Sequence, residues 1–128
     1  MGVWGFNMEE IQIKESALSG FSVLVNFEEW RIGVINYKDE LSLNNSPKKI
    51  ERHLKTDEAF ILSDGMATLF TGKDLRAYSM EKNKVYNIPM GVWHSILLSP
   101  DAVVFVVENK NTSEKNTEVI YLDEGSLK

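Results

Sequence analysis

The feature that most constrains the fold is a series of short apolar runs separated by turn residues at even intervals. Runs rich in β-branched and aromatic residues occupy 21–27, 30–37, 58–63, 66–70, 75–80, 85–88, 93–98 and 102–109, and this composition is typical of β-strands. Turn-forming residues interrupt the chain at 64–65, 71–73, 81–83, 89–91 and 99–101. Short strands at this spacing favour an antiparallel sandwich or barrel over parallel βαβ units.

The remaining segments give weaker signals. The runs at 11–14 and 119–122 are short strand candidates, and a strand is expected to end near His53. The best helix candidate, 7–19, is short and ambiguous. Trp4 and Phe6 stand in residues 1–10 beside two glycines, which makes this segment either a disordered lead or an arm that packs on a neighbouring subunit. We favour the arm, because these aromatics have no core of their own.

Length and composition limit the classes of protein to consider. The 128 residues suit one domain, 1–128, with a core over roughly 20–110. A net charge of −5 argues against a nucleic-acid partner. The absence of cysteine excludes disulfides and thiol chemistry. No apolar stretch approaches the length of about 20 residues that spans a bilayer, and the first ten residues do not resemble a signal peptide. We therefore expect a cytoplasmic protein that does not bind membranes.

Candidate functional residues gather at two places in the strand pattern. Glu51 and His53 are two apart, so their side chains leave an extended strand on one face, and Glu58 begins the next strand. His94, the second of only two histidines, follows a Pro89–Gly91 turn. If His94 points inward, Ile96 and Leu98 do so too. A lone histidine there would be a buried residue bonded to a carbonyl, but two histidines beside carboxylates indicate a site.

The spacing of these residues resembles the two motifs of the cupin superfamily. The first motif is His-x-His, three or four residues, Glu, six residues and Gly; the second is Gly, five residues, Pro-x-Gly, two residues, His, three residues and Asn. The matching positions in this chain are Glu51, His53, Glu58 and Gly65, then Asn83, Pro89, Gly91, His94 and Leu98. The resemblance implies an all-β double-stranded β-helix, the antiparallel jelly-roll barrel, and a homodimer.

Three positions depart from the motifs, and the first of them bears on the cofactor. Glu51 replaces a histidine, Asn83 a glycine and Leu98 an asparagine; Asn tolerates a left-handed backbone, so Asn83 is a mild change. The resemblance implies Glu51, His53, Glu58 and His94 as ligands of Mn, Fe or Zn, and this set remains competent. The same replacement also occurs where a cupin has lost its metal, and Glu51 would then turn outward to pair with Lys48 or Arg52.

A charge argument supports a site in either case. Two unpaired carboxylates in an apolar barrel are costly, so Glu51 and Glu58 must hold a metal, share protons at raised pKa values, or pair with protonated histidines. For a substrate, Phe60 and Tyr86 are candidate pocket residues, and Arg76 is a candidate carboxylate binder or a surface ion-pair residue; Arg31 carries the same two alternatives.

Three functions fit these observations. The first is a metal-dependent enzyme of isomerase, lyase or dioxygenase type that acts on a small polar or anionic metabolite. The second is a metal-free barrel that binds a metabolite without catalysis. The third rests on a shorter resemblance to ureidoglycolate lyase, itself a cupin, carried by Arg52-His53, Glu58-Ala59-Phe60-Ile61 and Gly91-Val92-Trp93-His94.

Overall fold

Ten strands form nearly all of the regular structure in the computed structural model, which describes residues 10–122. Two short 3-10 helices, η1 (Asp39–Leu41) and η2 (Glu114–Asn116), lie between strands. The strands are β1 (Gly20–Phe27), β2 (Trp30–Asn36), β3 (Lys49–His53), β4 (Glu58–Asp64), β5 (Ala67–Thr71), β6 (Arg76–Ser79), β7 (Tyr86–Ile88), β8 (His94–Leu98), β9 (Val103–Asn109) and β10 (Thr117–Tyr121).

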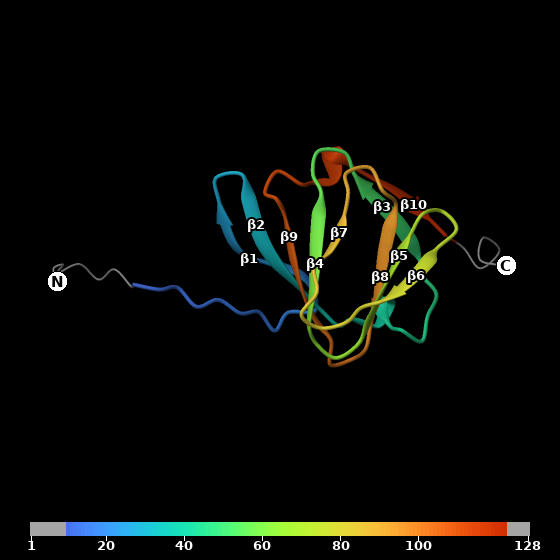
Figure 1. Ribbon diagram of the computed structural model, residues 1–128, viewed down its shortest axis with the longest axis horizontal. Helices are drawn as coiled ribbons and strands as arrows, with labels where there is room; N and C mark the ends of the chain where they lie inside the picture. Colours follow the sequence, from blue (N-terminus) through green and yellow to red (C-terminus); the bar gives the residue numbers. More distant parts are fainter. Residues whose placement is uncertain (1–9, 123–128) are drawn as a thin grey trace.

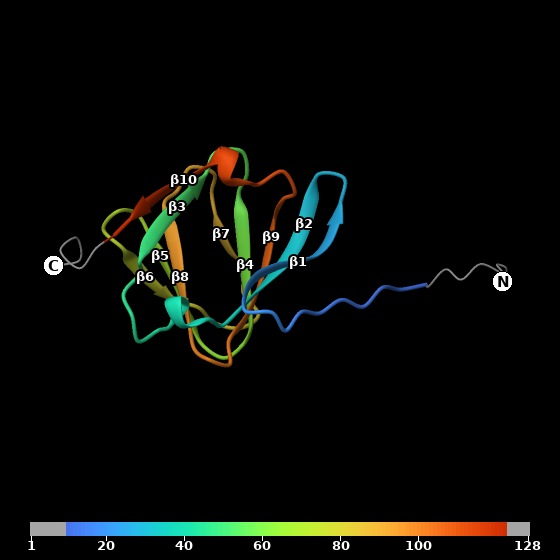
Figure 2. The ribbon, with the colours of Figure 1, turned by 180° about the vertical axis from the view of Figure 1, so that it is seen from behind.

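These strands form two five-stranded sheets that face each other (Figures 1 and 2). One sheet has the order β1-β2-β9-β4-β7 and the other β10-β3-β8-β5-β6. Every pairing between these strands is antiparallel. Strands distant in sequence are therefore neighbours, as in a jelly roll. The predicted all-β, antiparallel jelly-roll barrel is confirmed.

The core lies between the sheets because side chains alternate along each strand. In β4 and β9 every second residue is buried, and these residues include Phe60, Leu62, Val104 and Val106. Burial of every second residue is expected for a strand that turns one face toward the core. Ile96 and Leu98 belong to the same core cluster, as the sequence predicted.

Positive φ angles fall in four of the expected turns, at Gly65, Gly72, Asn83 and Gly91. Asn83 has a φ of 67°, which confirms that asparagine takes the left-handed conformation where the motif has glycine. Gly65, between β4 and β5, has a φ of 70°, and a Cβ there would lie 2.6 Å from Ala102 Cα. Glycine at 65 is therefore required by both backbone conformation and space.

The predictions for the first twenty residues were less accurate. Residues 11–14 do not form a strand, and residues 10–19 contain no helix; the segment is extended, and no hydrogen bond of the described residues involves the backbone of 10–15. Without a partner strand, the backbone N–H and C=O groups of this segment have no β-sheet hydrogen bonds. Trp4 and Phe6 lie outside the described residues. Within 10–122, no helix is both long and apolar enough to cross a membrane.

Candidate functional site

A cavity of about 850 Å³ opens between the two sheets. The sheet with β4 and β9 supplies one wall and the sheet with β3 and β8 the other. All four predicted metal ligands line this cavity: Glu51, His53, Glu58 and His94. The structure therefore brings together the groups that the two motifs predicted.

Cross-strand pairing positions the residues of the second wall. The Cα of Glu51 in β3 is opposite the Cα of His94 in β8. The Gly91 N–H donates to the His53 carbonyl at 2.8 Å, which fixes the turn before β8 against β3. Asp57 also holds this turn, because its carboxylate accepts from the Met90 N–H at 2.8 Å.

The centre of the cluster is the Glu58 carboxylate, which lies between the two imidazoles. Its Oε1 is 3.1 Å from His53 Nε2 and 2.9 Å from His94 Nε2. The two rings are 5.3 Å apart between centroids. All three side chains are buried, so these contacts are shielded from water and are strong.

The outer nitrogens of both rings are held by protein groups. His53 Nδ1 is 2.9 Å from the Thr117 hydroxyl oxygen, and His94 Nδ1 is 3.0 Å from the Val92 carbonyl oxygen. A carbonyl only accepts, so His94 Nδ1 carries a proton. A proton on one of the two atoms, or a cation bound between them, would satisfy the 2.9 Å contact of His94 Nε2 with Glu58 Oε1.

The same contacts shift the pKa values of the buried groups. Burial opposes ionisation of Glu58, but the hydrogen bonds from His53 and His94 lower its pKa to about 2. Burial also opposes the charged form of His53, yet the hydrogen bond and charge of Glu58, with the charge of Glu51, raise the pKa of His53 above 6.5. The cluster therefore favours an ionised carboxylate that faces protonated imidazole, the third of the charge arrangements expected from the sequence.

A further carboxylate, Glu108, belongs to the site and was not predicted. Glu108 in β9 is the cross-strand neighbour of Glu58 on one side and of Arg31 on the other. Arg31 donates to Glu108 Oε2 through Nε at 2.8 Å and through Nη2 at 2.6 Å. Burial and the nearby Glu58 raise the pKa of Glu108 to about 7, against the opposing effect of Arg31. The inward alternation at 104, 106 and 108 was the sequence signal that could have identified it.

Two overlapping sets of side chains place their donor atoms close enough together to hold a metal ion. In each set the ligand atoms lie within 4.8 Å of one another, and both sets include His53; they are Glu51, His53 and His94, and His53, Glu58 and Glu108. Nitrogen and carboxylate donors suit Mn, Fe or Zn. Hydrogen bonds to the outer Nδ1 atoms are also what metal-bound histidines make. These residues therefore fit a divalent transition metal.

The orientation of Glu51 differs from the outward alternative. Its side chain lines the cavity with 31% exposure, and its Oε1 lies 3.9 Å from His53 Nε2. Its Oε2 lies 3.9 Å from the Lys49 Nζ. Arg52 instead donates to Glu118 at 2.7 Å. Glu51 therefore faces the two imidazoles from the edge of the cluster.

The three predicted substrate contacts occupy different places. Phe60 lines the cavity, with its ring 6.0 Å from the His94 ring. Tyr86 packs against the core, and its hydroxyl accepts from the Glu81 N–H at 2.8 Å. Arg76 is exposed on β6, and its guanidinium lies 5.6 Å from the Tyr78 ring centroid. Only Phe60 of the three lines the cavity.

Two residues that carry the lyase resemblance lie away from the cavity. The Arg52 guanidinium stacks on the Trp93 ring at 4.7 Å from its centroid, and neither residue lines the cavity. His53, Glu58, Phe60 and His94 are the positions of that resemblance that do line it. Three of these four, His53, Glu58 and His94, are also positions of the general cupin motifs.

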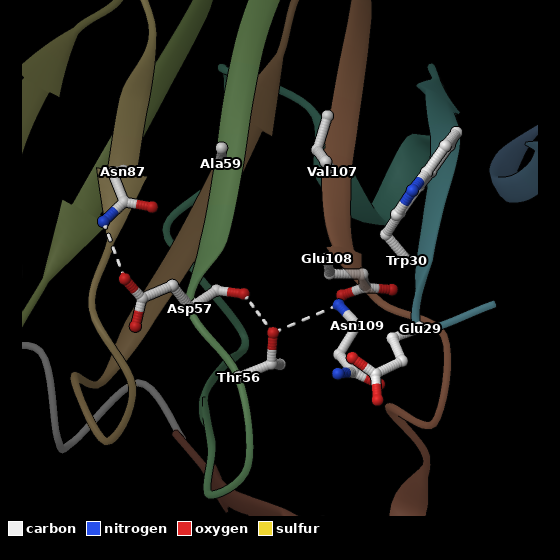
Figure 3. A pocket seen from close by; sticks show the side chains of 9 residues that line it. All are labelled: Glu29, Trp30, Thr56, Asp57, Ala59, Asn87, Val107, Glu108 and Asn109. Carbon is white, nitrogen blue, oxygen red and sulfur yellow. Dashed lines mark hydrogen bonds between the residues drawn. The ribbon is translucent and has the colours of Figure 1, made fainter. Parts of the chain in front are cut away.

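A second, shallower pocket of about 460 Å³ lies on the outer face of the β1-β2-β9-β4-β7 sheet (Figure 3). Ala59 and Val107 form its apolar floor between Trp30 on one side and Asn87 on the other (Figure 3). The Asn87 amide donates to Asp57 at 3.1 Å. Glu108 lines both this pocket and the cavity that holds the two histidines, which do not line this pocket.

Comparisons with known proteins find similarity in structure alone. No family model matches the chain, and no curated protein matches its sequence. The fold is similar to that of a cupin-2 domain protein from Shewanella frigidimarina, with a TM-score of 0.56 and 16% identity over 71% of this chain and 80% of that one. It is also similar to Pac13, a nucleoside dehydratase, with a TM-score of 0.60 and 10% identity over 88% and 89% of the two chains. A variant of Streptomyces Pac13 with uridine gives a TM-score of 0.60 and 12% identity over 98% and 97%.

Proposed function

We propose that this chain, which has the cupin fold, binds a small polar or anionic metabolite in its barrel and acts on it with a divalent transition metal. The observation that carries the proposal is the convergence of both imidazoles on one buried carboxylate oxygen, within 3.1 Å. Glu51 and Glu108 add two more carboxylates to this point. Glu58 and Glu108 are buried, and a divalent cation would offset the charge of the carboxylates gathered here.

The metal would be held by His53, His94, Glu58 and Glu51. When bound, a divalent ion supplies Lewis-acid polarisation of a carbonyl or carboxylate oxygen. The protein's own groups have separate tasks. Thr117 and the Val92 carbonyl orient the rings, and Glu108 offers a carboxyl group at the cavity wall whose protonation changes near neutral pH.

The lining of the cavity supports a polar or anionic ligand. Arg31 lies on the wall, and the exposed Lys48 and Lys49 also line the cavity. Apolar surface on the same walls comes from Phe60 and Ile96. A mostly apolar cavity with a few convergent charged groups is typical of small-molecule sites. The nucleoside dehydratase with a similar fold supports the same class of ligand.

Metal content and thermal stability test the proposal. The purified protein should contain close to one equivalent of Mn, Fe or Zn by elemental analysis. After chelation, addition of the ion should raise the melting temperature, because a ligand at 100 times its Kd stabilises by about 2.7 kcal/mol. Glu58→Gln should remove most of this gain. Glu81→Gln, which removes an exposed carboxylate paired with Lys84, should keep it.

A metal-free binding protein is the second candidate, and one observation favours it. The Glu58 carboxylate is already paired with both imidazoles, so the cluster balances its charge without an ion. Less than about a tenth of an equivalent of metal, with no gain in melting temperature on adding Mn, Fe or Zn, would reject the metal-dependent function. A small anionic metabolite that still stabilises the stripped protein would then support this second function.

A further inference from the structure

The shallow pocket of Figure 3 is formed by a row of residues across the outer face of the β1-β2-β9-β4-β7 sheet. Asn87 in β7 is opposite Ala59 in β4, and Ala59 is opposite Val107 in β9. Trp30 in β2 lies beyond this row and is the cross-strand partner of Asn109. Because Ala59 and Val107 have short side chains, a hollow of about 460 Å³ is left between Trp30 and Asn87 (Figure 3). We call this hollow the outer pocket.

Trp30 gives the outer pocket an aromatic wall. This residue is 43% exposed, and Figure 3 shows its ring edge-on, so that one face is turned toward Val107. The Phe27 ring lies 6.3 Å from the Trp30 ring between centroids, and the two residues are cross-strand partners. An exposed aromatic face beside an apolar floor is a surface on which a ring with C–H groups can pack.

The hydrogen-bonding groups at the two ends of the outer pocket are held by contacts within the chain. The Asp57 carboxylate accepts from Asn87 Nδ2 at 3.1 Å, which leaves the Asn87 side-chain oxygen for a ligand (Figure 3). At the other end, Asn109 Oδ1 accepts from the Asn111 N–H at 3.0 Å, which leaves Asn109 Nδ2 as a donor. The Thr56 hydroxyl joins the two ends, because it donates to the Asp57 carbonyl at 2.6 Å and accepts from the Asn109 N–H at 3.1 Å. This preorganisation lowers the entropy cost of binding.

The charge and the polar groups of the outer pocket favour a neutral ligand with several hydroxyls. Of the described residues that line it, none is basic, whereas Glu29, Asp57 and Glu108 carry carboxylates, so an anion is disfavoured. An organic cation has no acceptor for the Trp30 Nε1–H or for Asn109 Nδ2. A hydroxyl both donates and accepts, so a set of hydroxyls matches the donors and the acceptors together.

We propose that the outer pocket binds a neutral pyranose sugar, whose ring stacks on the Trp30 face above Ala59 and Val107. Its hydroxyls bond to the Asn87 oxygen at one end and to Asn109 Nδ2 at the other. The site lies on the outer face of the sheet, and neither histidine lines it. It therefore goes beyond the proposed function and does not depend on a metal in the barrel.

Nuclear magnetic resonance of the full chain tests the proposal, with the methyl pyranosides of glucose, galactose and mannose as probes. At about 20 mM, well above the Kd of about 1 mM expected for a ligand of this size, at least one probe should shift the Trp30 indole N–H resonance. That resonance is identified by its absence in Trp30→Phe. Backbone N–H resonances of β4 and β7 then give the Kd.

Two substitutions and a control locate the site. Trp30→Ala, which removes the aromatic wall, and Ala59→Leu, which fills the floor, should each raise the Kd at least about tenfold. Tyr78→Ala removes a ring of similar exposure, 40%, from the other sheet, and it should leave the Kd unchanged. The spectra also show whether each variant is folded; if Ala59→Leu does not fold, Trp30→Ala decides.

Four results overturn the proposal. One is the absence of a shift with all three pyranosides. Another is a Kd that the folded variants at positions 30 and 59 leave unchanged. A third is a set of shifts confined to residues of the inner cavity, such as Ser95 and Ile96. The last is an equal shift with choline chloride or sodium acetate at the same concentration, which would show that the outer pocket does not select neutral hydroxyls.

Discussion

The substitution Glu108→Gln gives the sharpest test of the electrostatics of the site. Glu108 is 6% exposed and has two opposing neighbours. Arg31 favours the ionised form, whereas burial and the Glu58 carboxylate favour the protonated form, and the net effect raises the pKa of Glu108 from 4.5 to about 7. The folded protein therefore binds this proton more tightly than the unfolded chain does.

The effect on stability follows from linkage. Because the folded pKa is the higher one, the stabilisation is complete below pH 4.5 and is lost as the pH rises to about 7. Each pKa unit corresponds to about 1.4 kcal/mol, so the loss approaches about 3 kcal/mol. Glu58 acts in the opposite sense, because its folded pKa of about 2 is depressed; its contribution is present above pH 4.5 and is lost as the pH falls toward 2. The raised pKa of His53 adds a further loss above pH 6.5. Stability of the metal-free protein should therefore be greatest near pH 5.

Urea denaturation of chelator-treated protein at pH 5, 6, 7 and 8, followed by tryptophan fluorescence, measures this profile. The free energy of unfolding of Glu108→Gln, measured relative to that of the wild type, should rise by up to about 3 kcal/mol from pH 5 to pH 8. This change is expected whatever the stability of the variant at pH 5. Glu40→Gln, which removes an exposed carboxyl at the cavity, controls for the loss of one charge. If the Glu108→Gln and wild-type profiles are parallel, or if the variant loses stability relative to the wild type as the pH rises, Glu108 is an ordinary ion-pair partner of Arg31 and the reasoning is refuted.

Two further predictions concern packing. Gly33→Ala should lower the free energy of unfolding by about 1–3 kcal/mol through overpacking, because the added Cβ would overlap ring carbons of Phe21. In a double-mutant cycle, Phe21→Ala in the same chain should recover part of this loss. Strictly additive effects of the two substitutions would contradict the clash. Leu98→Ala should lower the free energy of unfolding by about 2–5 kcal/mol, because it leaves a cavity at a site with no exposed surface. Leu54→Ala, at a 39% exposed site, is the matched control. Equal losses at both sites would show that burial is not the cause.

Sequence pattern predicted the fold well because the signals that define it are local. Alternation along β4 and β9, and turn residues such as Gly65 and Asn83, act within a few residues of themselves. The run at 11–14 shows the limit of this reasoning. Its alternation is that of a strand, but a strand also needs a neighbour, and the barrel offers none there.

The candidate site was predicted in part. The spacing of Glu51, His53, Glu58 and His94 placed them in one cavity, where the structure has them. Glu108 was missed because its role depends on strand order. Glu108 lies beside Arg31 and Glu58 only because β9 pairs with β2 on one side and with β4 on the other. The alternation of side chains along one strand cannot show which strands become neighbours. Arg76 lay outside the cavity for the same reason, since β6 is at the edge of its sheet.

The sequence by itself therefore determined the strands, their turns, and which side chains face inward, because the alternation of side chains and the conformational limits of glycine and asparagine are properties of short segments. The tertiary structure alone decided which inward-facing charges meet. The Glu58 carboxylate lies between two imidazoles because β3, β4 and β8 converge on it from two sheets. The pKa values of Glu58 and Glu108 diverge because burial and neighbouring charge are set by that convergence and by no single stretch of chain.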